Sequence, residues 1–144
     1  MGVVKETYDF FKNYVSLDKT PNICELGDQQ FMCCPPFPEQ SFVKDHFIKH
    51  GYNHVSIDLN GEGGALPLDL DKPITDPKLL NAFEIVTNFG TLEHVNNLYS
   101  GLKNVHNFCK VNGVMIHVGP YPGNWPNHGN HYLDEEFYIG FSKL

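Results

Sequence analysis

The sequence predicts an α/β fold: a doubly wound, mostly parallel sheet of about five strands with helices on both faces. One observation behind this prediction is that short apolar segments alternate along the chain with amphipathic segments of helical period, a pattern typical of parallel βαβ units. Units of this kind are connected by right-handed crossovers, and these produce a doubly wound sheet. The 144 residues predict one domain that spans the whole chain.

In the first half of the chain, apolar residues at steps of three and four predict a helix over 4–15. Residues 23–27 are apolar apart from Glu25, end at a turn glycine and predict the first strand. The prolines within 33–38 exclude a regular helix or a central strand and predict a loop. A helix over 39–50 and a second strand over 54–58 follow.

In the second half, residues 65–69 predict a short third strand, and a brief helical piece is expected near 79–80. A fourth strand is predicted over 83–87. The clearest helical period in the chain covers 95–109. A fifth strand over 114–118 completes the predicted sheet.

Charge and cysteine usage limit the classes of partner. The chain carries 10 Lys and Arg against 17 Asp and Glu, a net charge of −7, so a duplex nucleic acid or an anionic membrane is not an expected partner. The four cysteines form no CxxC pair and predict reduced thiols in a cytoplasmic protein. Charged residues interrupt the first stretch, so no signal peptide is expected, and no apolar run approaches the roughly 20 residues that span a bilayer.

Ligands of doubly wound sheets bind beyond the carboxyl ends of the strands. Gly27 at the first such end would let the backbone approach a ligand closely, and Glu25 could hold an ammonium group. Asp58, at the end of the second strand, could accept hydrogen bonds from both hydroxyls of a ribose. Its distance from the first strand exceeds the usual spacing of about 20 residues, and the 33–38 loop accounts for the excess. These residues predict a positively charged nucleoside ligand.

Five pieces of sequence occur in a definite order: ICELG at 23–27, HVSID at 54–58, LPLDL at 66–70, FEIVTNFGTLEHV at 83–95 and GVMI at 113–116. In this order they resemble the class I S-adenosylmethionine-dependent methyltransferases, which have a Rossmann-like fold. The most specific piece is a strand followed by Leu-Glu-His-Val at the start of a helix, which is very common in that family. The resemblance covers roughly residues 20 to 120.

The resemblance implies methyl transfer from S-adenosylmethionine to a small-molecule acceptor. Eight positions match cofactor-binding positions of the family: Glu25 and Gly27 at the methionine end, Asp58 at the ribose hydroxyls, Leu59 against the adenine, Asp69 and Leu70 at the adenine edge, and Asn88 and Phe89 on the floor beside the sulfonium. Catalysis of this kind depends mainly on aligning the acceptor with the methyl group. Where the acceptor must lose a proton, His94 and His117 are the expected catalytic bases by topology.

Two departures from the family pattern keep other functions open. Gln29 and Phe31 stand where the family usually has its second and third turn glycines. The family sheet usually has seven strands, and strands six and seven are not evident here. The fifth strand would then be an exposed edge of the sheet. The tail from Gly119 onward, or a second copy of the chain in a homodimer, would cover that edge. A non-catalytic or incomplete cofactor-binding domain is therefore one alternative. An NAD-dependent oxidoreductase is another, although Gln29 and the Leu-Glu-His-Val segment count against it.

Several of these residues also have a purely structural interpretation. Asp58 could initiate the turn that follows it, and the glycines of 61–64 suit a flexible turn better than a phosphate site. The aromatic tail, in which a helix is expected to begin near Asp134, could serve packing or contact substrate. No metal site is assigned, because the spacing of His128 and His131 with Cys33 and Cys34 does not by itself define a zinc site.

Overall fold

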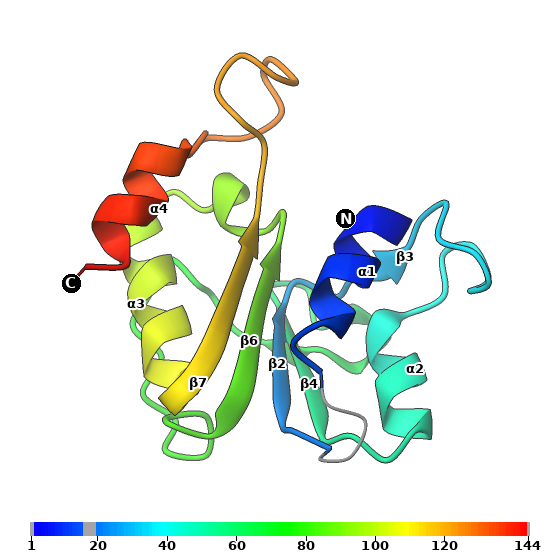
Figure 1. Ribbon diagram of the computed structural model, residues 1–144. Coiled ribbons are helices and arrows are strands. Elements are labelled where there is room, and N and C mark those ends of the chain that lie inside the picture. Colours follow the sequence, from blue (N-terminus) through cyan, green and yellow to red (C-terminus); the bar gives the residue numbers. More distant parts are fainter. Residues whose placement is uncertain (1, 16–19, 144) are drawn as a thin grey trace.

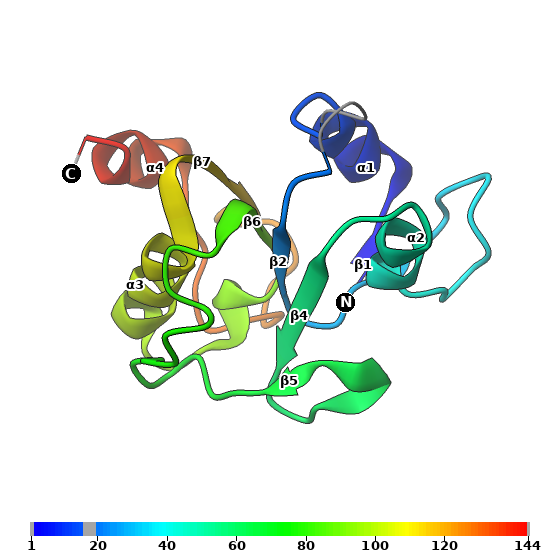
Figure 2. The same cartoon turned by 90° about the horizontal axis from the view of Figure 1, so that it is seen from below.

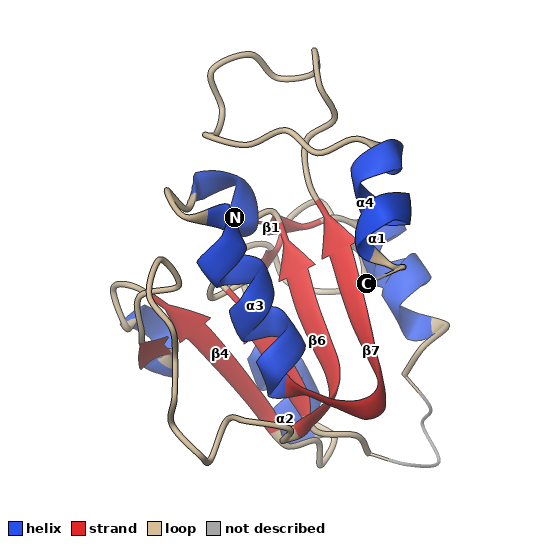
Figure 3. Ribbon diagram, turned by 90° about the vertical axis from the view of Figure 1, so that its left-hand side faces the viewer, coloured by secondary structure: helices blue, strands red, loops and turns tan. Residues whose placement is uncertain are grey.

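A computed structural model describes residues 2–15 and 20–143 (Figure 1). Its main sheet has five parallel strands in the order β5-β4-β2-β6-β7. The strands are β2 (Ile23–Leu26), β4 (His54–Asp58), β5 (Leu66–Pro67), β6 (Phe83–Phe89) and β7 (Cys109–Val118). The first strand of this sheet along the chain lies at its centre, and the order reverses there, which confirms the predicted doubly wound fold. Figure 3 shows β4, β6 and β7 pointing the same way.

Helices cover both faces of the sheet (Figure 2). On one face, α1 (Lys5–Lys12) and α2 (Val43–Lys49) bury Phe11 and Phe47 against strand residues such as Ile23. On the other face, α3 (Leu98–Phe108) and α4 (Glu135–Phe141) pack with Leu26 and its neighbours. Side chains alternate between the two faces along each strand, so both faces of β2 are buried.

A second, two-stranded parallel sheet was not predicted from the sequence. It pairs β1 (Gly2–Val3) with β3 (Gln30–Phe31), next to α1 and α2. Strands of two residues are too short to show an alternating pattern, so the sequence carries no periodic signal for them. The sheet anchors Phe31, which is buried and stacks on Phe37 with ring centroids 3.9 Å apart.

Element boundaries differ from the predictions at capping residues. The chain forms a short 3₁₀ turn, η2 (Leu92–His94), before α3. Helix α3 begins only at Leu98, because the Asn97 side chain caps it by accepting a hydrogen bond from the Ser100 N–H at 3.1 Å. The next element begins at once, so Cys109 opens β7 instead of ending the helix. The helical piece expected near 79–80 is wrong: these residues form turns.

Four further elements are shorter than predicted or are new. Helix α1 ends at Lys12, α2 begins at Val43 after an extended Phe42, and β5 keeps only two of the five expected residues. A 3₁₀ turn, η1 (Glu62–Gly64), occupies the glycine-rich segment. None of the helices in the described part of the chain has the length and apolar character that crossing a membrane requires.

Candidate functional site

A pocket of about 310 Å³ opens at the carboxyl ends of β2, β4 and β5, beside the η2 turn that follows β6. We call it the carboxyl-end pocket. Its volume lies within the roughly 300–1,000 Å³ of small-molecule sites. Five of the eight cofactor-binding positions that the sequence resemblance implies line it: Gly27, Asp58, Leu59, Asp69 and Leu70. The topology brings them together because parallel strands end at one edge of the sheet.

The lining of the pocket is acidic on one side and apolar on the other. Asp28, Asp58, Asp69 and Asp71 contribute carboxylates, and none of the described lining residues is Lys or Arg. Apolar side chains come from the strand ends and from the η2 region, among them Ile57, Leu68, Leu70 and Val95. Such a lining suits a ligand that combines an apolar ring with hydroxyl or cationic groups.

Asp58 holds the backbone of two turns. Its Oδ2 accepts a hydrogen bond from the Asp28 N–H at 3.2 Å, and its Oδ1 accepts one from the Asn60 N–H at 3.2 Å. Asp58 therefore does initiate the turn after β4. A carboxylate has about four acceptor sites, so two remain for a ligand at this half-buried residue.

Gly27 requires the freedom of glycine. Its φ is +76°, and a Cβ there would lie 2.6 Å from Thr91 Oγ1 and 2.8 Å from Gln29 Nε2. The turn is thus closed tightly against two polar side chains. Thr91 was not singled out in the sequence, although it follows Gly90, the glycine that comes directly after β6.

Gln29 fills the space between β2 and the turn after β6. Its Nε2 donates hydrogen bonds to the Leu26 carbonyl at 3.0 Å and to Thr91 Oγ1 at 3.2 Å, and Thr91 Oγ1 donates to the same carbonyl at 2.7 Å. We call this arrangement the Gln29–Thr91 bridge. It joins the two strands between which the sheet order reverses. Gln29, one of the two residues that stand where the resemblance implies turn glycines, is therefore buried, with 1% of its surface exposed.

Glu25 lies beneath this turn and does not line the pocket. Its Oε1 accepts a hydrogen bond from the Gln29 N–H at 2.7 Å, and its Oε2 lies 3.5 Å from His54 Nε2. Burial raises the pKa of Glu25 well above its usual range. Burial lowers the pKa of His54 to about 3, with a smaller contribution from the charge of Lys44. Both shifts favour the neutral forms, so the pair acts as buried support for the turn.

A buried ion pair supports the same turn. Lys44 Nζ lies 2.9 Å from Asp28 Oδ1, and both side chains are only 7% exposed. Ser56 accepts a hydrogen bond from Lys44 at 3.0 Å and donates one to Asp28 at 3.1 Å. Because Lys44 compensates the charge of Asp28, the pocket acids without an ion pair among the described residues are Asp58 and Asp71. Asp69 is itself paired with Lys72 at its exposed edge.

Asn88 and Phe89, expected as the floor beside the sulfonium, have other positions. Asn88 Oδ1 accepts hydrogen bonds from the N–H groups of Thr91 at 3.1 Å and Leu92 at 2.9 Å, so it shapes the η2 turn from below. Phe89 is buried against Phe11, with ring centroids 5.9 Å apart on the α1 face. Neither residue lines the carboxyl-end pocket.

The two histidines expected as bases lie in different places. His94 lines the carboxyl-end pocket, and 42% of its side chain is exposed. His117 lies beneath α4, where its ring centroid is 5.6 Å from that of Tyr138. Burial lowers the pKa of His117 to about 4. It borders a separate groove of about 610 Å³, between α1 and α4 along β7.

The possible zinc ligands named from the sequence are not gathered into one cluster. Cys34 is buried in the core with Phe11, and Cys33 is exposed. In residues 2–15 and 20–143, potential metal ligands gather instead at Glu93, His94 and His128. No family model, curated protein or solved structure gives a significant match to this chain.

Proposed function

We propose that this domain binds S-adenosylmethionine in the carboxyl-end pocket and transfers its methyl group to a small-molecule acceptor. One observation carries the proposal: five residues at positions that match the family's cofactor site line one pocket beyond the strand ends. Their sequence positions are far apart, and the pocket that they share has the volume of a small-ligand site.

The donor and acceptor groups of the pocket fit this cofactor. Asp58 keeps acceptor sites for ribose hydroxyls, and Leu59 and Leu70 offer apolar surface to an adenine ring. The carboxylates suit a ligand whose sulfonium and ammonium groups are positive. When bound, this cofactor would supply a methyl group on a cationic sulfur. The residues of the chain would orient it and the acceptor.

The same lining disfavours an NAD-dependent oxidoreductase. A dinucleotide carries a pyrophosphate, which proteins bind with backbone N–H groups at a glycine-rich helix start or with Lys and Arg. Here Gln29 replaces the second glycine, and the described lining residues include four aspartates and no Lys or Arg. Binding of an anionic diphosphate at this surface would cost electrostatic energy.

A second candidate is a cofactor-binding domain without catalytic activity. The Gln29–Thr91 bridge favours it, because the bridge occupies space between the strand ends where the family has glycines. Both candidates bind an S-adenosyl ligand. They differ in product formation, because only the first forms S-adenosylhomocysteine when S-adenosylmethionine is supplied with small hydroxyl or amine acceptors.

Calorimetric titration with S-adenosylhomocysteine tests binding. We expect a dissociation constant in the micromolar range, equivalent to about −8 kcal/mol. Asp58→Asn should weaken binding by at least about 1 kcal/mol, a factor of roughly five, because it removes a charged acceptor. Asp45→Asn, on the exposed surface of α2, is the matched control and should leave the affinity unchanged. Thermal unfolding of both variants would show whether each is folded.

No heat of binding and no thermal shift at millimolar S-adenosylhomocysteine would refute both candidates. Heat with NAD and none with S-adenosylhomocysteine would instead support the oxidoreductase.

We also propose a cytoplasmic location and a homodimer formed through β7. Free thiols at all four cysteines support the first. For the second, β7 is an edge strand of the described sheet, and Val111 on it is 85% exposed.

A further inference from the structure

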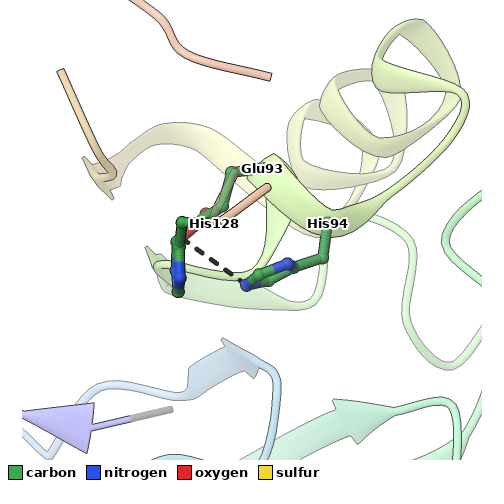
Figure 4. A group of neighbouring side chains, drawn as sticks. All are labelled: Glu93, His94 and His128. Carbon is green, nitrogen blue, oxygen red and sulfur yellow. Dashed lines mark ion pairs between the residues drawn. The ribbon is translucent and has the colours of Figure 1, made fainter. Parts of the chain in front are cut away.

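Glu93, His94 and His128 lie close together (Figure 4), and His94 also lines the carboxyl-end pocket. Glu93 and His94 belong to the η2 turn, and His128 comes from the tail that follows β7. Glu93 Oε1 lies 4.0 Å from His94 Nε2 and 3.7 Å from His128 Nε2. We propose that these three side chains bind a divalent transition-metal ion, and that Zn²⁺ is the ion their chemistry fits best.

The distances suit such an ion after small side-chain movements. One ligand atom from each residue lies within 4.8 Å of the other two. Bonds of about 2.0–2.2 Å in a tetrahedral zinc site place ligand atoms about 3.3–3.5 Å apart. Adjustments of roughly 1 Å in the side chains would close the set. Two imidazoles and one carboxylate are a donor set found in catalytic zinc sites.

The buried carboxylate is an independent observation that points to a cation. The Glu93 side chain is only 5% exposed, and its Oε2 has no hydrogen-bond partner in the described residues. A buried carboxylate with an unpartnered oxygen is costly unless a positive charge compensates it. A bound metal ion would provide that charge.

The backbone around the cluster is held in place. The Glu93 carbonyl accepts hydrogen bonds from the N–H groups of Asn130 at 2.6 Å and His131 at 3.1 Å, which join the tail to the η2 turn. Gly129 allows this approach, because a Cβ there would lie 2.7 Å from the Glu93 carbonyl oxygen. The site is therefore built by two segments whose contact is fixed independently of the metal.

His128 has its own support. Its ring stacks on Trp125 with centroids 3.6 Å apart, and its backbone N–H donates a hydrogen bond to the Tyr132 hydroxyl at 2.8 Å. The hydroxyl in turn donates to the Trp125 carbonyl at 2.9 Å. Such outer contacts orient ligands and raise metal affinity. This gives the tail a role in forming the site.

Three protein ligands leave a coordination position open, as in catalytic zinc sites. His94 also lines the carboxyl-end pocket, so the open position would face a molecule bound there. Under the proposed methyl transfer, that position would hold a hydroxyl group of the acceptor, and His94 would be a metal ligand in place of a base. This last step rests on the proposed function; metal binding itself does not.

The test uses the full chain, stripped with a chelator, in a Cys33→Ser background, because Cys33 is exposed and could bind metal by itself. Calorimetric titration with Zn²⁺ should give one ion per chain. Co²⁺ should give the visible absorption of a low-coordinate site without sulfur ligands. Glu93→Gln and His128→Gln should each weaken Zn²⁺ binding at least about tenfold.

Glu135→Gln and His106→Gln are matched controls, because both residues are exposed on helices and neither belongs to the cluster. They should leave the affinity unchanged. His128 is partly exposed, so His128→Gln keeps the test decisive if Glu93→Gln fails to fold. Absence of one-to-one binding, or binding that His128→Gln leaves unchanged, would show an ion pair only and overturn the proposal. Failure to bind S-adenosylhomocysteine would refute the proposed function and leave the metal result standing.

Discussion

The Gln29 side chain joins the turn after β2 to the turn after β6, so its removal should loosen both. In Gln29→Ala two buried hydrogen bonds are lost, at about 1 kcal/mol each, together with about 0.8 kcal/mol for a buried methylene. The substitution also removes Gln29 Oε1, which is buried without a hydrogen-bond partner among the described residues, and this recovers about 1 kcal/mol of stability. The Leu26 carbonyl keeps its bond from Thr91, so no new unpaired group is left. The net loss is about 2 kcal/mol.

Urea unfolding measures this loss as a lower midpoint at constant slope. For a chain of this length it corresponds to a decrease of about 6 °C in the melting temperature. The neighbouring Gln30→Ala is the control, because Gln30 belongs to β3 and does not line the pocket. It should cost less than about 0.5 kcal/mol.

The same variant tests whether the Gln29–Thr91 bridge restricts the ligand. Space freed between β2 and η2 should raise the affinity for S-adenosylhomocysteine about tenfold, equivalent to 1.4 kcal/mol. Equal unfolding midpoints for Gln29→Ala and Gln30→Ala would show that the bridge does not hold the two turns together. Unchanged affinity in a destabilised Gln29→Ala protein would refute its part in restricting the pocket.

Three further results are expected. Gly27→Ala should lower the free energy of unfolding by about 1–3 kcal/mol, because Gly27 has a positive φ and the Thr91 hydroxyl lies close to the position of an added Cβ. Gly140→Ala has open space at its Cβ and should be neutral or stabilising in thermal melts. Similar losses of stability in the two variants would refute the steric reasoning. Burial lowers the pKa of His117 from 6.5 to about 4, so the stability of the fold should decrease as the pH falls from 6.5 towards 4. His117→Asn should flatten this part of the dependence of urea unfolding on pH. An unchanged pH dependence in His117→Asn would contradict this role of His117. Light scattering should give a dimer mass that Val111→Lys reduces to a monomer; a monomeric parent protein would refute the β7 interface.

The strands of the main sheet, but not their order, follow from local features of the sequence. The segments at 23–27, 54–58 and 83–87 are rich in apolar and β-branched residues because β2, β4 and β6 are mostly buried, so their composition identified them. The right-handed crossover rule predicted a doubly wound sheet, and the structure showed that β2 lies at its centre. Boundaries were less predictable, because they depend on single interactions such as the Asn97 cap.

The sequence by itself determined which residues stand at the carboxyl ends of the strands. Only the tertiary structure decided where their side chains point. Side chains alternate between the faces of a strand, so Glu25 and Phe89 turn towards the α1 and α2 face while the pocket opens at the strand ends. The turn after β2 is closed by Gln29, and the tail brings His128 to Glu93 through backbone hydrogen bonds. Such contacts join segments that are far apart in the chain, and no local periodicity encodes them.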